Sequence, residues 1–565
     1  MKLMNAVKII LLVAMIWLPT IFFFSRSTPS PVQENYAEME GQVEELQRNM
    51  RSLQEINRDL KNKLTEIVIE QEAAWKENSK KRDKVWSKYG YDAGEYEVER
   101  RKLERGLWEM LVSMSSNDST WTSKYRVHAA NKLVALLATS TKLELIAEQK
   151  RSSLRSITDA IQKELNTSQH PGECSNAKFL GCSLPGTCGF GCQVHHLTYC
   201  LLVAFASNRV LFIRRGGWGY HREGWTGAFR FPNTCELPEE EVDWPMNEDE
   251  SEGGGNSAVS GGGNTETPFS DQKFFYLKSI TFSLYRPDYL PLSIPKPIAE
   301  QLIALHSNPP AFFIGQFARF ILNPKPDLQK FIDISASHVP FGSAPICGMH
   351  VRRTDKLDVE AKYHPVSEYM KWCEVYFQIQ ERRLKHALRR IVYVASDDPT
   401  VIPEIRGKYQ NYEVFGDVAF AESAHDDMSR YSERSLRGLV TDVLLLSRCD
   451  YLVCGLSSHF CRLAYELMQV VHIGDAGDRV RSLDEMYYFG GQHPHEYIAI
   501  EEHSPQDSNE ISLEIGDVIE FKANLWNGSF DGVNRRTAKR GLLPSYKVEE
   551  KWRIVDFPVL EKIFR

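Results

Sequence analysis

Residues 345–356 read PICGMHVRRTDK, a mainly apolar run that ends at two adjacent arginines, Arg352 and Arg353. The segment 346–351 has the length and composition of a buried strand, and one acid and three bases follow it. In an open α/β sheet the ligand binds beyond the carboxyl ends of the strands, which is where these arginines fall. Because a guanidinium binds phosphate oxygens through two hydrogen bonds and keeps its charge, the pair indicates a diphosphate site. These residues alone leave open a surface loop with a salt bridge to Asp355.

Two further apolar runs end in small or charged residues, and helical patterns lie between the runs. The runs are 391–395 and 451–454, and the helical patterns are 366–388 and 435–447. Strands that alternate with helices in this way predict a doubly wound α/β fold with a nucleotide-binding half. Ser457 and Ser458 precede a helix-like run at 461–469, whose N-terminal amides are suited to phosphate. A sugar nucleotide is therefore the expected ligand.

Several motifs of this region resemble, in content and order, those of the α-1,6-fucosyltransferase family, the core fucosyltransferases of N-glycans. The motifs are HVRRTDK (350–356) with Glu360, HPVSEYM (364–370), SDDP (396–399), SLRGLVTDV (435–443), CGLSSHFC (454–461) and YYFGGQ (487–492). The resemblance implies a GT-B-like glycosyltransferase with a Rossmann-type half. It also implies transfer of L-fucose from GDP-β-L-fucose, in α-1,6 linkage, to the innermost, Asn-linked GlcNAc. Two alternatives are a protein O-fucosyltransferase, which shares the arginine loop, and a non-catalytic lumenal glycan-binding scaffold.

Fucosyl transfer needs a stabilised diphosphate leaving group and a base for the acceptor hydroxyl. His350 and Arg352 suit the first task, and the resemblance makes Glu360 the base, beside Lys356, in an inverting direct displacement. Further residues match family positions. Arg353, Asp397 and Asp398 match essential positions, Asp442 would hold guanine or ribose, and Tyr220, Ser458, Gly191 and Cys192 would complete the donor site.

The adjacent acids Asp397 and Asp398 also raise the question of a manganese site. Adjacent aspartates before a proline such as Pro399 often cap a helix instead. Because arginines are available to neutralise the diphosphate, we expect no metal and no cofactor beyond the donor substrate.

The composition of the whole chain sets broader limits. Its 565 residues are 42% hydrophobic and 25% charged, enough for a large core and more than one domain. The formal net charge of −7 shows no basic excess, which argues against nucleic acid as a partner.

An apolar run at 9–24, broken only by Pro19 and Thr20, follows Lys2 and Lys8. We expect an uncleaved signal anchor with residues 1–8 cytoplasmic and the rest lumenal, which is a single-pass type II topology. The family resemblance implies that the membrane is that of the Golgi. A cleaved signal peptide is the alternative, but no small-x-small site precedes Ser25.

Residues 25–170 are expected to form a stem. An apolar seam with spacings of three and four at 39–67 predicts a coiled coil, and a second helical region runs through 103–165. We assign these helices to the stem and to dimerisation, and the resemblance also implies a homodimer.

Six cysteines lie in the first part of the expected catalytic domain, 171–491, and lumenal topology favours disulfides over zinc. A metal knuckle at Cys188 and Cys192 is the alternative, and the six cysteines allow fifteen pairings. The resemblance implies the pairs Cys174–Cys235, Cys182–Cys200, Cys188–Cys192 and, separately, Cys454–Cys461. Cys347, Cys373 and Cys449 are then expected to be buried thiols.

Residues 492–555 resemble the strand and turn order of an SH3 domain. Leu525 stands where the first groove tryptophan would be, which argues against peptide binding. The family resemblance implies a wall for the acceptor glycan or a dimer contact instead. His459 is a second departure from residues that relatives use near the acceptor. The glycine- and serine-rich segment 239–265 is expected to be a disordered insertion.

Overall fold

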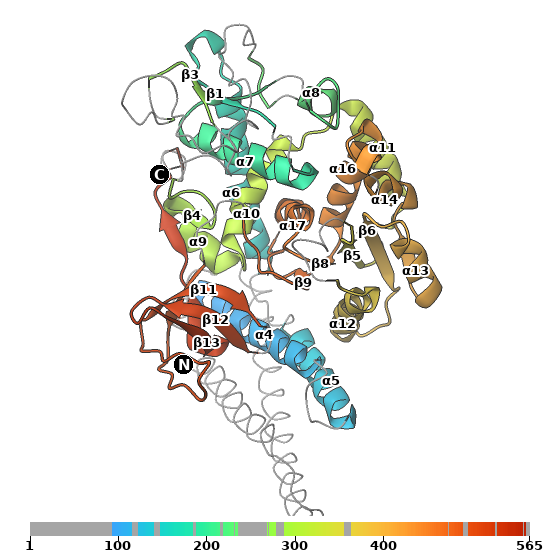
Figure 1. The fold of residues 1–565 in the computed structure, drawn as a ribbon, viewed down its shortest axis with the longest axis vertical. Helices are drawn as coiled ribbons and strands as arrows, with labels where there is room; N and C mark the ends of the chain where they lie inside the picture. Colours follow the sequence, from blue (N-terminus) through green and yellow to red (C-terminus); the bar gives the residue numbers. More distant parts are fainter. Residues whose placement is uncertain are drawn as a thin grey trace, which may run out of the picture. The chain divides into compact units, whose positions relative to one another are not determined.

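The structure is a computed structural model of the chain (Figure 1). The residues that it describes are 93–115, 123–140, 147–184, 188–214, 218–230, 232–235, 268, 271–277, 287–354, 363–425, 427–472, 474–489, 495–525, 528–557 and 559–560. The predicted anchor at 9–24, the seam at 39–67 and the insertion at 239–265 lie outside these ranges. Among the described helices, none has the length and apolar character needed to cross a membrane.

A five-stranded parallel sheet in the order β7-β6-β5-β8-β9 organises the largest part of the fold. Its strands are β5 (Ile346–Val351), β6 (Ile391–Ser396), β7 (Glu413–Phe415), β8 (Tyr451–Cys454) and β9 (Val480–Ser482). The helices along this part of the chain are α11 (Pro326–Ser337), α12 (Val366–Leu384), α13 (Val401–Lys408), α14 (Val418–His425), α15 (Asp427–Arg430), α16 (Glu433–Arg448) and α17 (His459–Val471). Every residue of β5 and β6 is buried, as expected for a parallel sheet covered on both faces. The predicted doubly wound α/β half is confirmed.

The register of this sheet brings the carboxyl ends of its strands to one edge. His350 pairs with Ala395 of β6 and with Cys454 of β8, and Val351 pairs with Ser396. The chain therefore leaves β5, β6 and β8 at the same level, and the polar residues that follow these strands share that edge.

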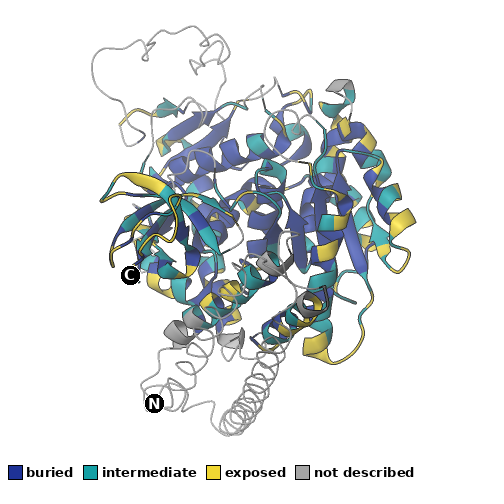
Figure 2. Cartoon of the chain, turned by 60° about the horizontal axis from the view of Figure 1, so that its bottom comes forward, coloured by how far each residue is buried: buried dark blue, intermediate teal, exposed yellow. Residues whose placement is uncertain are grey.

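A second, three-stranded parallel sheet has the order β2-β1-β3. Its strands are β1 (Phe179–Cys182), β2 (Val210–Ile213) and β3 (Phe274–Tyr276), and the nearby helices are α7 (Phe190–Ala206), α8 (Trp225–Ala228), α9 (Lys296–Leu305) and α10 (Pro309–Ile321). Helix α17 packs against α10 and α7, and α7 packs against β1 and β2 of the second sheet. Figure 2 shows that the helices and strands in the middle of the fold are mostly buried.

The N-terminal helices α4 (Ala93–Ser115), α5 (Ser123–Ser140) and α6 (Ala147–Gln169) fall in the predicted helical region. Helix α6 packs within the fold. Its apolar residues Leu154, Ile157 and Ile161 are buried, and the helix packs against α7, α9 and α10 of the same chain. The sequence could not specify this packing, because an amphipathic stripe does not reveal which surface covers it. The assignment of residues 25–170 to a stem and dimerisation region stays a prediction.

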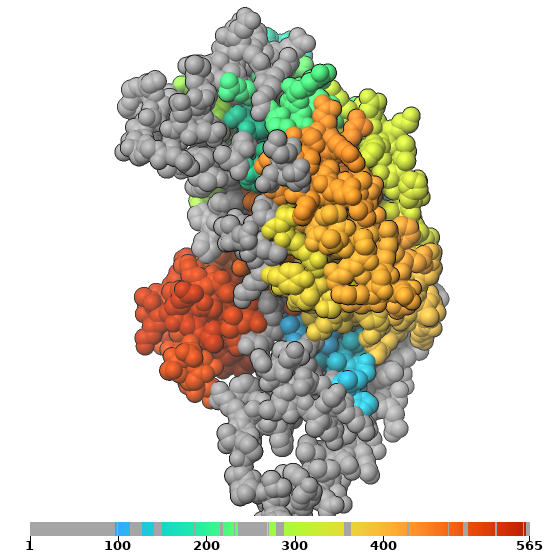
Figure 3. Space-filling view, turned by 45° about the vertical axis from the view of Figure 1, so that its right-hand side comes forward, coloured from blue at the N-terminus to red at the C-terminus, as the bar shows by residue number. Residues whose placement is uncertain are grey.

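The described residues of the segment 495–550 form a five-stranded antiparallel sheet, which lies in the red region of Figure 3. Its strands are β10 (Glu496–Ala499), β11 (Val518–Asn524), β12 (Ser529–Asn534), β13 (Lys539–Pro544) and β14 (Val548–Glu550). Helix α4 contacts this sheet through Glu109, which accepts a 2.7 Å hydrogen bond from the Ser545 hydroxyl. The last strand, β15 (Arg553–Val555), leaves the sheet and pairs in parallel with β4 (Ser293–Pro295).

The disulfides confirm the four implied pairs and add one more. Cys174–Cys235, Cys182–Cys200, Cys188–Cys192 and Cys454–Cys461 are all bonded. The expectation of free thiols at Cys347 and Cys373 is wrong, because these residues form a fifth disulfide between β5 and α12. Cys449 is free and buried as expected, and burial raises the pKa of its thiol well above the usual value.

Candidate active site

The turn that follows β5 is held by Asp397, the first residue after β6. Its Oδ1 accepts a hydrogen bond from the Arg353 amide at 2.8 Å, and its Oδ2 accepts one from the Thr354 amide at 3.1 Å. The Arg352 guanidinium and the Thr354 hydroxyl also donate to Oδ2. One buried carboxylate thus fixes three consecutive residues, including both arginines of the opening motif.

Arg353 makes a second, separate set of contacts. Its guanidinium lies 3.4 Å from Asp398 and 3.3 Å from Glu404, and it stacks over the Tyr363 ring at 5.2 Å. The other oxygen of Asp398 accepts hydrogen bonds from the Thr400 amide at 2.8 Å and the Thr400 hydroxyl at 2.6 Å. Asp398 therefore holds the turn before α13 and also binds Arg353, whereas the N-cap residue of α13 is Thr400 rather than one of the two acids.

The ionisation of the two aspartates follows from these partners. Burial opposes ionisation of Asp397, but the charge of Arg352 and the hydrogen bonds from Thr354 and Arg353 outweigh it and lower the pKa. Burial likewise opposes ionisation of Asp398, and hydrogen bonds from Thr400 and Arg353 lower its pKa. Both side chains are therefore anionic at neutral pH and paired with cations.

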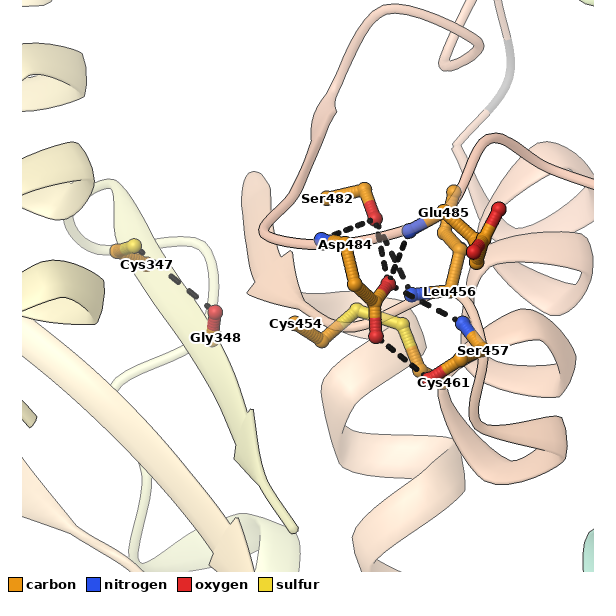
Figure 4. The surroundings of a disulfide bond; sticks show 9 residues. All are labelled: Cys347, Gly348, Cys454, Leu456, Ser457, Cys461, Ser482, Asp484 and Glu485. Carbon is orange, nitrogen blue, oxygen red and sulfur yellow. Dashed lines mark hydrogen bonds between the residues drawn. A yellow bond between two sulfur atoms is a disulfide. The ribbon is translucent and has the colours of Figure 1, made fainter. Parts of the chain in front are cut away.

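The loop after β8 forms the other side of this edge and is fastened by Asp484 (Figure 4). Asp484 accepts hydrogen bonds from the amide and the hydroxyl of Ser457, at 3.2 and 2.5 Å. The Cys454–Cys461 disulfide joins the end of β8 to the first turn of α17, and Ser458 is the N-cap residue of that helix. The N-terminus of α17 is thus fixed at the same edge as Arg352.

The start of α7 approaches the start of α17 closely. A Cβ atom on Gly191 would lie 2.8 Å from the Phe460 nitrogen and 2.9 Å from the His459 carbonyl carbon, so only glycine fits. Cys192 follows Gly191 and is bonded to Cys188. The predicted backbone site at 191–192 is therefore brought next to Ser458.

Tyr220 and His350 lie beside these two helix ends. The Phe190 amide, at the start of α7, donates a 3.1 Å hydrogen bond to the Tyr220 hydroxyl. Burial raises the pKa of Tyr220 to about 12, so the phenol is neutral. The His350 ring lies 4.7 Å from the Phe460 ring.

Asp442 lies on α16, below the carboxyl ends of the strands. The Tyr393 hydroxyl of β6 donates a 2.6 Å hydrogen bond to its Oδ1. Burial raises the pKa of Asp442 to about 8; the hydrogen bond from Tyr393 works in the opposite direction, and Asp417 adds to the rise. The expected contact with guanine or ribose stays a prediction.

Most of the predicted residues thus lie at this edge in two groups. The first is the network of Arg352, Arg353, Asp397 and Asp398, and the second is formed by Gly191, Cys192 and Ser458 at the starts of α7 and α17. Glu360 and Lys356 lie outside the described residues. Sequence reasoning missed Asp484 and Thr354, although Thr354 stands inside the opening motif. It also missed Arg430, whose guanidinium lies 3.4 Å from the Thr354 hydroxyl.

The fold and the geometry of this edge together define a class of protein. The fold is a doubly wound α/β fold, and its ligand edge combines paired arginines with a fixed helix N-terminus, an arrangement suited to an anionic nucleotide.

Comparison with known proteins identifies the family. Residues 1–488 match the family described as alpha-(1,6)-fucosyltransferase N- and catalytic domains. The alpha-(1,6)-fucosyltransferase of Caenorhabditis elegans is 38% identical over 473 residues, which cover 82% of this chain and 80% of the relative. That of Drosophila melanogaster is 36% identical over 491 residues, with 82% and 74% covered. The chain therefore belongs to the alpha-(1,6)-fucosyltransferase family and is a glycosyltransferase, which confirms the resemblance seen in its motifs.

Among solved structures, the fucosyltransferase NodZ from Bradyrhizobium is similar at 14% identity and a TM-score of 0.31. The match covers 51% of this chain and 92% of that one.

Proposed function

We propose that this chain transfers L-fucose from GDP-β-L-fucose, in α-1,6 linkage, to the innermost, Asn-linked GlcNAc of N-glycans. Membership of the alpha-(1,6)-fucosyltransferase family carries the proposal. The paired arginines at the ligand edge support it, because a diphosphate needs fixed cations there. A protein O-fucosyltransferase or a non-catalytic scaffold is not favoured by these relatives.

On the donor side, Arg352 would bind the diphosphate in the ground state and stabilise its charge as the bond to fucose breaks. Asp397 acts as a positioning residue, since it holds the arginine turn through two amides and a hydroxyl. Arg353 and Asp398 support the same turn from its other side. His350, Tyr220, Ser458, and the Gly191 and Cys192 backbone would complete the donor site, with Asp442 near the nucleoside.

On the acceptor side, Glu360 would remove the proton of the attacking hydroxyl, assisted by Lys356. Attack on the face opposite the leaving diphosphate inverts the configuration, so a β-linked donor gives an α-linked product.

The residues do not fit a resident metal at the predicted acidic pair. Both oxygens of Asp397 already accept hydrogen bonds, and a metal there would displace Arg352 or the turn amides. Among the described side chains, a metal-like cluster occurs at Cys182, His196 and Cys200, where the two cysteines are joined in a disulfide. Metal-free transfer is therefore part of the proposal.

The remaining parts of the proposal concern architecture and location. The enzyme would be GT-B-like, anchored by residues 9–24 in the Golgi membrane with its catalytic part lumenal, and a homodimer through its N-terminal coiled coil. The antiparallel sheet at 495–550 supports an SH3-like domain, used as an acceptor wall or dimer contact rather than as a peptide-binding site. Its Leu525 is exposed at the position expected for a groove tryptophan.

One transfer assay tests the activity. The purified protein is given GDP-fucose with either an N-glycopeptide or a folded, unglycosylated domain, and the site of fucose is mapped by mass spectrometry. Fucose on the innermost GlcNAc is expected. Transfer to protein hydroxyls, or no transfer to either acceptor, would contradict the proposal.

A further inference from the structure

A chain of buried polar groups leads from the interior of the protein to the N-terminus of α17. His459 is the first residue of this helix, and its Nδ1 lies 3.0 Å from Nδ1 of His195 on α7. Nε2 of His195 lies 3.0 and 3.1 Å from the two oxygens of Glu466, which also accepts a 2.9 Å hydrogen bond from the Tyr487 hydroxyl. His195 is 3% exposed and Glu466 is fully buried.

The hydrogen bonds determine where the protons lie. A carboxylate at Glu466 can only accept, so Nε2 of His195 carries a hydrogen. In the neutral pair, Nδ1 of His195 is then the acceptor and His459 donates from its own Nδ1. Nε2 of His459 therefore carries a lone pair. One additional proton on the pair places a hydrogen on Nε2 of His459, whichever ring holds the charge.

Arg462, one turn into α17, is a second buried charged side chain in this region. Its guanidinium is fully buried and lies 3.6 Å over the Tyr488 ring. Within the described part of the chain, none of its three nitrogens has a hydrogen-bond partner. The charges of Arg462 and Glu466 both act on the buried Tyr487 hydroxyl, and the oxygens of Glu466 accept from His195 and Tyr487.

We infer that the chain from Glu466 through His195 to His459 is a proton-dependent contact for the diphosphate of the nucleotide, an inference that rests on the proposed donor site at Ser458 and Gly191. Without ligand, the α17 N-terminus disfavours an added positive charge at His459. A bound diphosphate reverses this preference, since its negative charge attracts a protonated imidazole. Proton binding and diphosphate binding are thus linked, and each strengthens the other. His459 is the contact residue, and His195 and Glu466 are positioning residues.

Other ionisable groups face the same region. Each variant proposed below keeps all of them except the residue that is substituted. They are His195 from α7, Arg462 and Glu466 from α17, Tyr487 and Tyr488 from the loop after β9, and His350 from β5 through its contact with Phe460. A difference in pH dependence between the native protein and a His459 variant therefore reports on His459 itself.

The test is calorimetry with GDP between about pH 5.5 and pH 8, where a histidine ordinarily changes charge. GDP affinity of the native protein should rise as the pH falls, more steeply than that of His459→Gln. The ratio of the two affinities should change by about 3–10-fold over the interval, well below the ceiling of about tenfold per pH unit that one linked proton allows. Glu466→Gln keeps an acceptor oxygen and removes the charge, so its pH dependence should move to lower pH.

His472→Gln is the matched control, since His472 lies at the opposite end of the same helix. It should keep the native pH profile, and circular dichroism should show that all variants are folded. Equal pH profiles for the native protein and His459→Gln, with GDP binding intact, would overturn the proton link and leave the proposed function standing. Failure of the native protein to bind GDP at any pH would overturn both.

Discussion

Replacing Asp397 by asparagine should disable the enzyme while leaving it folded. The amide oxygen of asparagine can still accept from the Arg353 amide, but its NH₂ group would face three donors, from Arg352 and Thr354. Hydrogen bonds to charged groups contribute about 1.5–3 kcal/mol each. Because some of these contacts can rearrange, we expect the variant to lose about 3–4 kcal/mol of the transition-state stabilisation that a correctly placed Arg352 provides. This corresponds to a fall of about 10²–10³ in kcat/KM.

Asp398→Asn is the matched comparison. Its oxygen would keep both bonds to Thr400 and lose only the longer contact with Arg353, so a loss within about tenfold is expected. Transfer to a glycopeptide, GDP calorimetry and thermal unfolding would be measured on both variants. If Asp397→Asn retains activity within a few-fold of the native enzyme, or if Asp398→Asn is the more damaged, Asp397 does not organise the arginine turn.

Four further predictions concern other parts of the molecule. Arg352→Lys should weaken GDP binding and lower activity by at least about 10²-fold. Glu360→Gln should keep GDP affinity within a few-fold while turnover falls by about 10²–10⁴-fold. Near-normal turnover of Glu360→Gln would show that Glu360 is not the base. Because burial raises the pKa of Asp442 to about 8, its contribution to stability is present below the unfolded value near 4 and is lost as the pH rises through 8. Asp442→Asn should therefore raise the unfolding temperature near pH 7.5 and lose this advantage near pH 4, and a pH-independent difference would argue against the raised pKa. Mass mapping of the unfolded, unreduced protein should find Cys449 as the single labelled thiol among the eleven cysteines, and a labelled Cys347 would contradict the fifth disulfide. Transfer should continue in excess chelator, and strict dependence on an added divalent cation would contradict metal-free catalysis.

The strands that carry the site could be predicted because a parallel sheet buries both faces of each strand. β5, β6 and β8 therefore stand out as unbroken apolar runs, and the polar residues that end them mark the ligand edge. The sequence also showed that Asp397 and Asp398 could either bind a metal or have a structural role. Only the geometry shows that Asp397 holds the arginine turn, whereas Asp398 holds the turn before α13.

Contacts between distant segments could not be predicted in the same way. Cys347 and Cys373 pair because one face of α12 meets β5, and neither residue type nor spacing specifies that face. His195 and Glu466 are 271 residues apart and meet only because α7 packs on α17. The sequence around a buried histidine or glutamate does not indicate which distant residue it will contact.

The return of β15 to β4 has a practical consequence for shortened forms of this protein. The antiparallel sheet at 495–550 is held at both ends, since the chain goes back to the α/β unit after leaving it. Phe557, just beyond β15, is fully buried against Phe205, Tyr289 and Phe313. Truncation before residue 495 would therefore remove the strand that pairs with β4 and leave a cavity where Phe557 packs. Excising 495–550 alone, with a short linker that rejoins the flanks, is the cleaner way to learn what that sheet contributes.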